Sequence, residues 1–382
     1  MRIGIDAREL CGRATGVGRY LGGLLREWET DSRARSHEFV LYTTEPIEIA
    51  PHASHFSSHT IPGSSGTWWE QVRAPRASAA DRLDVWFAPA YSAPLRLRVP
   101  TVVAIHDLSF VAHPEWFRFR EGARRRWLTS QSASHAAAVI TISEFSKKEL
   151  IERLNVPAGR VHVIPPGIGA GDWGPEAKDR TASAVRPQAQ APRPERVLFV
   201  GSVFNRRHVV DLIRAFAPIA RAHPDAVLDL VGDNRSYPRE DLQQAIIGEQ
   251  IESQVRWHEY VTDEQLGALY AGARAFAFLS EYEGLGLTPL EALAAGVPPV
   301  LLDTPVARES CGAAALYVPV SDIKATTRGL EALLFDETVR QRILDAAPAE
   351  LGKYSWSRAA RRTLAVLENT CGAGREALRT RT

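Results

Sequence analysis

Short apolar segments alternate with amphipathic ones through both halves of the chain, and this alternation is the feature that most constrains the fold. The apolar segments predict strands at residues 2–6, 37–42, 85–88, 102–105, 139–142, 161–164, 197–200, 227–231, 255–258, 275–279 and 299–302. Helical spacing predicts helices at 119–137, 144–154, 208–222, 238–249, 263–271, 289–295 and 356–369. This order is typical of parallel sheets covered by helices on both faces. We therefore expect an α/β fold with two doubly wound, Rossmann-like domains that face a cleft.

The chain is long enough for two domains, and residues 169–195 mark the boundary between them. It has 382 residues, and a domain usually takes about 100–200. Residues 169–195 are rich in Ala, Pro, Gly and Arg and lack an apolar period, so we interpret them as a linker. The expected domains are residues 1–170, completed by a C-terminal helix at 355–370, and residues 195–354. In such domains ligands bind beyond the carboxyl ends of the strands.

The composition argues against several other classes of protein. With 46 Lys and Arg against 45 Asp and Glu, the net charge is +1, whereas proteins that bind nucleic acid through its phosphates usually have a basic excess. The three cysteines are too few and too scattered for a disulfide framework or a Cys-rich zinc site, and they suit a reducing compartment. No run approaches 18 apolar residues, and the charged first residues do not form a signal peptide. We expect a cytoplasmic protein that binds no nucleic acid.

The most informative segment is residues 280–298, where a strand runs into a loop with two glycines and a helix follows. We expect the helix to begin at Pro289, because proline is a preferred first helical residue. The first amides of such a helix attract an anion. Glu283 in the loop and Glu291 in the helix are carboxylates, which accept hydrogen bonds from vicinal diols, so the segment suits a ribose and a hexose beside a diphosphate. A capped helix with surface glutamates is the alternative that the spacing leaves open.

This segment resembles the donor signature of the retaining family-4 glycosyltransferases of GT-B fold, Glu-Gly-x-Gly-Leu-x-Pro-x-Glu-Ala-x-Ala-x-Gly-x-Pro. Weaker matches to the family lie at residues 4–8, 16–20, 105–108, 142–146 and 199–202. The resemblance implies that Glu283 lies near the donor hexose and that Glu291 binds the ribose of the nucleotide. It also implies that the donor contacts the loop between them, which consists of Gly284, Leu285, Gly286 and Leu287.

Gly201, Arg206 and Arg207 form a second candidate site, between a strand and a helix. Two adjacent cations at this place can neutralise a diphosphate leaving group, and we expect Gly201 to contact the donor. The family usually has Arg-Lys here, whereas this chain has two arginines. The planar guanidinium of Arg207 therefore stands where the family has the compact ammonium group of a lysine. A solvated basic helix start is the alternative interpretation.

His106 and Asp107 follow the expected strand 102–105 at its carboxyl end. A lone histidine there is more often structural, but the resemblance makes His106 a contact of the donor sugar, through its ring or its backbone carbonyl. Asp107 either orients the histidine or binds the acceptor, and the sequence leaves both open. Trp68 and Trp69 are expected in a loop, where they either stack on an acceptor sugar or form a buried pair.

Gly16 and Gly18 lie in a glycine-rich turn before a helix that we expect to start at Arg19. They do not form a dinucleotide fingerprint, because the third glycine of that motif would fall at Leu21. The resemblance instead implies that the backbone of this turn approaches the phosphate or the sugar of the donor.

Residues 115–127 combine five arginines with four aromatic residues. Residues 1–170 also carry 21 basic side chains against 17 acidic ones. Such a segment suits an anionic membrane surface or a lipid diphosphate, which predicts peripheral contact with the inner face of the cytoplasmic membrane. The alternative is a solvated helix whose aromatic residues belong to the core.

The resemblance as a whole implies an enzyme, a hexosyltransferase that moves a sugar from a nucleotide-sugar donor to a saccharide acceptor with retention. Residues 4–8, 16–20 and 105–110 are similar to mannosyltransferases of bacterial O-antigen and exopolysaccharide assembly. This similarity favours GDP-mannose as donor and a lipid-linked acceptor, with a UDP-sugar as the second choice. The sequence also leaves open a nucleotide-sugar epimerase of the same fold and a non-catalytic nucleotide-sugar-binding subunit. We expect no metal and no cofactor, because arginines and helix amides can stabilise the leaving diphosphate.

Overall fold

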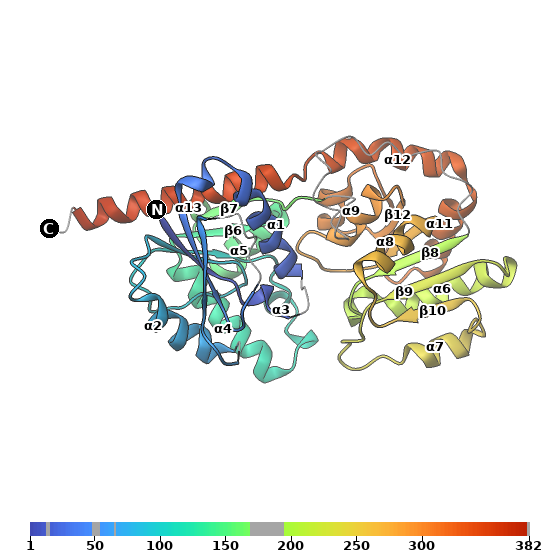
Figure 1. The fold of residues 1–382 in the computed structure, drawn as a ribbon. Coiled ribbons are helices and arrows are strands. Elements are labelled where there is room, and N and C mark those ends of the chain that lie inside the picture. Colours follow the sequence, from blue (N-terminus) through green and yellow to red (C-terminus); the bar gives the residue numbers. More distant parts are fainter. Residues whose placement is uncertain (13–15, 48–53, 65, 169–194, 380–382) are drawn as a thin grey trace. The chain divides into compact units, whose positions relative to one another are not determined.

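A computed structural model of the chain describes residues 1–12, 16–47, 54–64, 66–168 and 195–379. It divides into two compact units, one made of Met1–Gly167 with Tyr354–Thr382 and the other of Ile168–Lys353 (Figure 1). Each unit contains one parallel sheet with helices packed on it, which confirms the α/β class and the Rossmann-like architecture. Apart from Glu195, the linker expected at residues 169–195 lies outside the described residues.

The first unit is built on a seven-stranded sheet in the order β3-β2-β1-β4-β5-β6-β7, and every strand pair is parallel. Its strands are β1 (Arg2–Asp6), β2 (Glu38–Thr43), β3 (Phe56–Thr60), β4 (Val85–Ala88), β5 (Thr101–Ala104), β6 (Ala138–Thr141) and β7 (Val161–Val163). Its helices are α1 (Gly16–Thr30), α2 (Ala74–Ser78), α3 (Ser109–Ala112), α4 (Phe119–His135), α5 (Glu144–Leu154) and α13 (Trp356–Arg379).

Successive residues of the central strands belong to two hydrophobic cores, one on each face of this sheet. Ile3 and Ile5 of β1 lie in the core that α1 and α13 cover. On β4, Val85 and Phe87 share that core, whereas Trp86 lies in the core on the other face, with residues of α2, α4 and α5. Side chains alternate between the faces of a strand, so a strand that is buried on both faces must be apolar throughout. This is why the strands appear in the sequence as continuous apolar runs.

The helix α13 packs on the sheet of the first unit, beside α1 and over β4, β5 and β6 (Figure 1). Gly23 of α1 permits the close approach, because a Cβ atom there would lie 2.5 Å from the ring of Trp356. Trp28 donates from its indole Nε1 to the backbone oxygen of Ala360 at 3.0 Å. Residues of α13 therefore complete a core that otherwise consists of residues from the start of the chain.

The second unit has a six-stranded parallel sheet in the order β10-β9-β8-β11-β12-β13. Its strands are β8 (Arg196–Val200), β9 (Val227–Val231), β10 (Val255–His258), β11 (Ala275–Phe278), β12 (Pro299–Leu302) and β13 (Leu316–Val318). Its helices are α6 (Val209–Ala222), α7 (Leu242–Glu249), α8 (Asp263–Gly272), α9 (Leu287–Ala294), α10 (Pro305–Cys311), α11 (Ile323–Phe335) and α12 (Glu337–Leu351).

Three expected assignments of secondary structure at candidate site residues are wrong. The helix α9 begins at Leu287 instead of Pro289, because Gly286 adopts a left-handed backbone with φ of 83° and directly precedes it. Gly16 and Gly18 belong to the first turn of α1, not to a preceding loop. Trp68 and Trp69 both have helical backbone, and the helical turn Trp69–Arg73 continues into α2, although a loop was expected for the two tryptophans.

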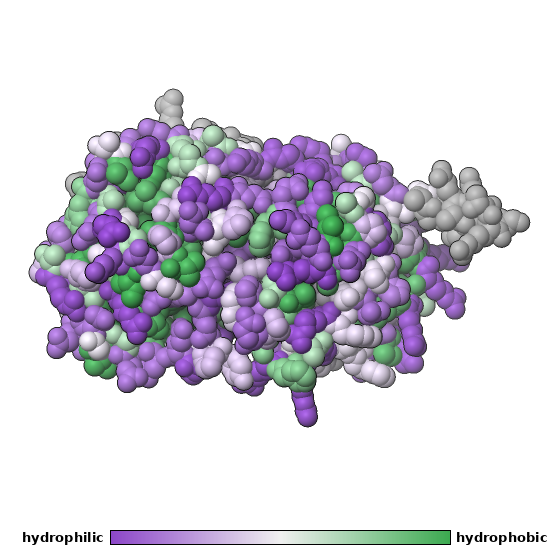
Figure 2. All heavy atoms as spheres, turned by 180° about the vertical axis from the view of Figure 1, so that it is seen from behind, coloured by the Kyte–Doolittle hydropathy of each residue, from purple (hydrophilic) through white to green (hydrophobic). Residues whose placement is uncertain are grey.

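The surface of the molecule is mainly hydrophilic on the face drawn in Figure 2, where hydrophobic side chains form small separate patches. No helix in the described part of the chain is long and apolar enough to cross a membrane. Scattered apolar side chains of this kind are normal for a protein surface.

Candidate functional site

The expected donor residues of the second unit lie on turns that follow neighbouring strands. Gly201 directly follows β8, and the turn Asn205–Arg207 comes four residues later. Residues 279–286 connect β11, which pairs with β8, to α9. Gly201 has φ of 146°, and a Cβ atom there would lie 2.6 Å from Nη1 of Arg207. The absence of a side chain at Gly201 is therefore needed for Arg207 to lie against the end of β8.

Arg207 and Glu283 form an ion pair that is largely shielded from solvent. The guanidinium donates to Oε1 of Glu283 from Nε and from Nη2, at 2.8 Å each. Ser280 donates from its hydroxyl to the same oxygen at 2.8 Å, and Nη1 of Arg207 donates to the backbone oxygen of Ser202 at 2.9 Å. These contacts fix the position of the Glu283 carboxylate within residues 279–286, which we call the signature loop.

Arg206 is anchored to the segment that precedes Glu283. Its backbone oxygen accepts a hydrogen bond from the amide of Glu281 at 2.9 Å, and its Nε donates to the backbone oxygen of Tyr282 at 3.3 Å. The guanidinium also lies 4.3 Å from the ring centre of Phe204, a distance suited to a cation–π contact. The structure thus brings Glu283 to Gly201, Arg206 and Arg207, although Glu283 lies 76 residues after Arg207 in the sequence.

Glu291 lies in the second turn of α9, and its partner is a residue that the sequence analysis missed. The hydroxyl of Tyr270, on α8, donates to Oε2 of Glu291 at 3.3 Å. Tyr270 is buried whereas Glu291 is partly exposed, so the tyrosine anchors one oxygen of a carboxylate that solvent can reach. An isolated tyrosine in a helix carries no sequence signal for this contact.

His106 is buried in the first unit, between two tyrosine rings. Its Nε2 donates to the backbone oxygen of Pro89 at 2.8 Å, and its ring lies edge to face with Tyr20 at 4.8 Å and Tyr91 at 5.6 Å between centres. Burial lowers the pKa of His106 below its ordinary value, against the opposing effect of the bond to Pro89. A neutral imidazole that donates from Nε2 keeps Nδ1 as an acceptor. The backbone oxygen of His106 already accepts from the hydroxyl of Ser146 at 3.0 Å.

Asp107 has two hydrogen-bond partners, and neither of them is the ring of His106. The hydroxyl of Tyr91 donates to Oδ2 at 2.6 Å, and the amide of Ser109 donates to Oδ1 at 2.8 Å. Tyr91 has a left-handed backbone with φ of 60°, a conformation that non-glycine residues adopt mainly where function or tight packing requires it. Tyr91 therefore holds both His106 and Asp107 in place, although the sequence analysis did not single it out.

The first unit also contains a buried ionic cluster that the sequence analysis missed. Arg8 donates to Asp6 from Nε at 2.8 Å and from Nη2 at 2.6 Å, and Nη2 also donates to Glu70 at 2.8 Å. Burial alone would lower the pKa of Arg8, but the charges of Asp6 and Glu70 outweigh it and raise the pKa. The cluster ties the end of β1 to the helical turn Trp69–Arg73.

The two expected acceptor tryptophans differ in exposure. Trp69 is only 1% exposed and donates from its indole to the backbone oxygen of Ile61 at 2.8 Å. Trp68 is 67% exposed. Of the two, Trp68 is the one whose ring can meet a sugar or another partner from solution.

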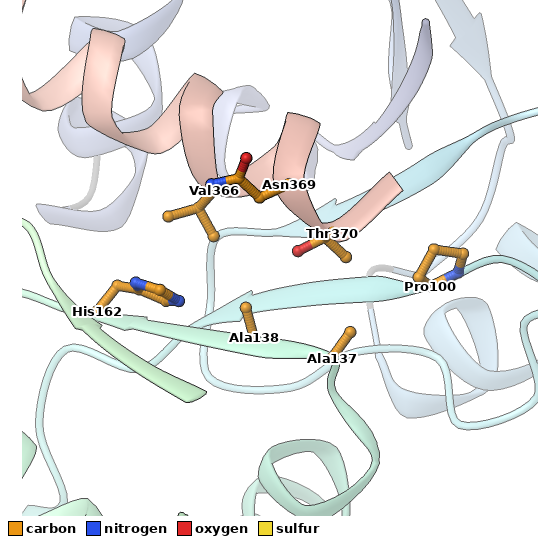
Figure 3. A pocket seen from close by; sticks show the side chains of 7 residues that line it. All are labelled: Pro100, Ala137, Ala138, His162, Val366, Asn369 and Thr370. Atoms are coloured by element: carbon orange, nitrogen blue, oxygen red, sulfur yellow. The ribbon is translucent and has the colours of Figure 1, made fainter. Parts of the chain in front are cut away.

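No group of three or more His, Cys, Asp or Glu residues in the described part of the chain can hold a metal ion. A hollow of about 250 Å³ lies in the first unit, where His162 and Ala138 of the sheet face Val366 and Thr370 of α13 (Figure 3). It is also lined by Pro100 and Ala137, which directly precede β5 and β6. The hollow is therefore at the amino ends of these strands, away from His106 and Asp107.

Two parallel-sheet units, a strand–loop–helix segment with paired glutamates and an adjacent arginine pair define a glycosyltransferase of GT-B fold. The chain belongs to this class of enzymes. Residues 14–170 match the model "Glycosyltransferase Family 4", and residues 183–350 match the model "Glycosyl transferases group 1". The chain is thus a hexosyltransferase, and its resemblance to family 4 is confirmed.

Among known proteins, the chain is similar to the O-antigen chain mannosyltransferase B of Escherichia coli, with 26% identity over 283 residues, or 73% of each chain. It is 27% identical over 273 residues, or 69% of each chain, to the alpha-D-kanosaminyltransferase of Streptomyces kanamyceticus. Its fold resembles the sucrose-phosphate synthase of Thermosynechococcus elongatus, with a TM-score of 0.74 at 18% identity over 98% of this chain and 100% of the other. The names of the E. coli and Streptomyces proteins therefore state different sugars.

Proposed function

We propose that the chain transfers a hexose from a nucleotide sugar to a hydroxyl group of a saccharide, with retention at the anomeric carbon. The observation that supports this best is that Glu283 and Glu291 are each held by a partner that is largely buried, Arg207 and Tyr270 respectively. Glu291 binds the diol of the ribose, and Glu283 accepts from a hydroxyl of the hexose. Arg206 and Arg207 stabilise the leaving diphosphate together with the amides of residues 284–287.

The proposed reaction needs no protein nucleophile. The bond from the anomeric carbon to the diphosphate oxygen breaks, and the bond to the acceptor oxygen forms on the same face of the sugar. The acceptor proton passes to the departing diphosphate. Arginine side chains and helix amides stabilise the charge that develops on that group, so we expect activity to persist when metal ions are chelated.

The two units have different tasks in this proposal. The donor binds to residues 195–354, and the acceptor binds to residues 1–170, together with the helix at 355–370. In the first unit, Nδ1 of the neutral His106 accepts a hydrogen bond from a hydroxyl of the donor sugar. Gly16 and Gly18 present helix amides to the donor. Asp107 and Trp68 contact the acceptor.

GDP-mannose is the donor that we favour, with a lipid-linked acceptor of bacterial polysaccharide synthesis. The name of the E. coli relative supports mannose, whereas the Streptomyces relative carries the name of another sugar. A UDP-sugar is the second choice. A panel of GDP, UDP, ADP and dTDP tests the nucleotide, because the ligand that binds the folded chain raises its melting temperature. Binding of none of the four would contradict a nucleotide-sugar donor.

Incubation of the chain with the donor alone separates transfer from epimerisation. A transferase leaves GDP-mannose unchanged apart from slow hydrolysis and releases GDP rapidly once an acceptor is added. An epimerase changes the sugar without any acceptor, and a binding subunit does neither. Release of GDP that depends on a saccharide acceptor is the result that we expect.

We propose further that the first unit contacts an anionic membrane, through a surface that we call the α4 surface. It comprises the exposed side chains of Trp68, Phe119 and Trp127, with exposed fractions of 67%, 82% and 58%, and the exposed arginines 118, 120 and 124. Arg124 donates to the hydroxyl of Thr67 at 2.6 Å, so the helical segment that carries Trp68 lies beside α4. Exposed aromatic rings among arginines suit the interface of a membrane with anionic lipids.

A further inference from the structure

His208 occupies an unusual place at the end of the turn Asn205–Arg207, which we call the arginine turn. It follows Arg207 directly, precedes α6, and has a left-handed backbone with φ of 47° and ψ of 42°. A non-glycine residue in this region is uncommon and calls for a physical reason. The side chain is 18% exposed and lies against the carboxylates of Glu281 and Asp211, and these contacts supply that reason.

Both ring nitrogens of His208 lie against carboxylates. Nε2 is 2.6 Å from Oε1 of Glu281, and Nδ1 is 3.2 Å from Oδ2 of Asp211. A neutral imidazole donates from one nitrogen only, and its other nitrogen would then face a carboxylate with a lone pair. Only the imidazolium can donate to both carboxylates at once.

The contact between His208 and Glu281 is one of a set that joins the arginine turn to the signature loop. The amide of Glu281 donates to the backbone oxygen of Arg206 at 2.9 Å, and Arg206 donates to the oxygen of Tyr282. Arg207 pairs with Glu283. Imidazole is the side-chain group whose charge ordinarily changes between pH 5 and 8, so a bridge that needs the imidazolium can respond to pH.

Other charged groups also face this histidine. Arg214 of α6 donates to Oδ1 of Asp211 at 3.2 Å. Glu240 interacts electrostatically with His208, Asp211 and Arg214, and its pKa is raised, mainly by burial. Glu281 and Asp211 supply the two contacting carboxylates, and Arg206 and Arg207 are the neighbours on the chain. The surroundings thus contain three carboxylates, two of them in contact with the ring.

We infer that His208 is a positioning residue that holds the arginine turn against the signature loop in its protonated form, and so makes binding of the nucleoside diphosphate depend on pH. The inference rests on the proposed function, because it concerns the same donor site. Protonated His208 bridges Glu281 and Asp211 and keeps Arg206 and Arg207 in place for the diphosphate. When the proton is lost, one of the two bonds is replaced by a lone pair that faces a carboxylate, and the turn loosens.

The test is the binding of GDP and UDP to the purified full chain between about pH 5.5 and about pH 8.5, the range in which an imidazole usually changes charge. His208→Ala removes both bonds. His208→Asn keeps one donor and tolerates the left-handed backbone. His223→Asn is the matched control, since His223 lies at the other end of α6 and its ring nitrogen is 3.8 Å from Glu195. Melting temperatures establish that each variant is folded.

At pH 6 we expect His208→Ala to weaken binding of the better ligand about tenfold, the effect of losing a charge-assisted hydrogen bond. The ratio of the dissociation constants of variant and wild type should shrink as the pH rises. His208→Asn should weaken binding less and show no such trend, and His223→Asn should match the wild type.

Two results would overturn the inference. Equal binding by wild type and folded His208→Asn at pH 6 would show that the proton on His208 does not matter, and a variant-to-wild-type ratio that is the same at every pH would assign it a merely structural role. Absence of binding by the wild type at every pH would overturn the proposed function as well. The two failures are therefore distinguishable.

Discussion

Arg207 meets Glu283 through the side of its guanidinium: two nitrogens, Nε and Nη2, donate to the same carboxylate oxygen, Oε1, at 2.8 Å each. Ser280 donates a third hydrogen bond to that oxygen. Within the described residues Oε2 of Glu283 makes no hydrogen bond, so this oxygen is available to a sugar hydroxyl. Arg207 therefore supports Glu283, in addition to the contact with the diphosphate that we propose for it.

Glu283→Gln should separate turnover from nucleotide binding. We expect kcat/KM to fall by about 2–4 kcal/mol of transition-state stabilisation, the effect of removing one electrostatic group. The affinity for the nucleoside diphosphate should stay the same or rise, because a negative charge near the phosphates is lost. Steady-state kinetics and a binding titration on the same preparation check both. An equal loss in both quantities would place Glu283 at the diphosphate instead of the hexose.

Arg206→Ala should weaken both transfer and binding of the nucleoside diphosphate. The expected loss is about 2–4 kcal/mol in kcat/KM, since the side chain stabilises the leaving group. Arg221→Ala is the matched control, because Arg221 is an exposed arginine at the end of α6 that pairs with Glu249. Unchanged kinetics in a folded Arg206→Ala variant would remove this residue from the proposed site.

Tyr270→Phe should raise the KM for the donor more than it lowers kcat. The change removes one hydrogen bond to Glu291, which contributes about 1 kcal/mol, so the KM for the donor should rise about fivefold. Glu291→Gln should raise it further. A donor with a 2′-deoxyribose should bind the wild type less tightly but should bind Glu291→Gln nearly as well as the normal donor does. Full use of the deoxy donor by the wild type would refute the ribose contact.

The α4 surface should bind anionic liposomes in a salt-dependent way. Each arginine near such a membrane contributes roughly 1 kcal/mol, and salt screens this attraction over about 8 Å. Replacing Phe119, Trp127, Arg118 and Arg120 by Ser should abolish cosedimentation and leave nucleotide binding intact. Arg126 is left unchanged because its Nη1 donates to the backbone oxygen of Phe110.

Neutral liposomes and an Ile247→Ser variant are the controls for this experiment, since Ile247 is an exposed apolar residue of α7 in the other unit. Wild-type binding that persists in the quadruple variant, or no binding by the wild type, would leave the α4 surface as an ordinary solvated face.

Glu368→Gln should lower the stability of the first unit in a pH-dependent way. Burial raises the pKa of Glu368, but hydrogen bonds from Arg33 and His37 outweigh it and lower the pKa below its ordinary value. A lowered pKa in the folded state stabilises the fold above the pKa of the unfolded chain, and this contribution is lost as the pH falls through the folded value. Calorimetry from pH 7 to about pH 3 should therefore show the difference in melting temperature shrinking. A difference that stays constant would assign the effect to packing.

The sequence predicted the elements whose pattern is local. The strands of both sheet centres and the helix α5 lie where the apolar patterns predicted them, because burial on both faces leaves a continuous apolar run. The strand β3 was missed because its sequence, Phe-Ser-Ser-His-Thr, is polar, and as the outermost strand it is only partly buried. The helical turn at Trp69–Arg73 was missed because its paired tryptophans suggested a loop.

The candidate site shows the same limit at the level of single residues. Glu283, Glu291 and the two arginines carry a motif with fixed spacing, so the sequence singled them out. Tyr270 and His208 carry no motif, and their partners lie 21 and 73 residues away along the chain. Such contacts depend on which strands become neighbours in the sheet, and the order of the strands is not written in any local pattern.

The packing of α13 on the first unit has a consequence for how the polypeptide matures on the ribosome. Residues such as Leu364 and Leu367 of that helix are needed to fill a core that starts with Ile3 and Ile5. Synthesis runs from the N-terminus, so all of the second unit is synthesised before this helix. The unit that is synthesised first is therefore completed last, and a nascent chain that stalls before residue 356 would expose to chaperones the part of its first sheet that α13 covers.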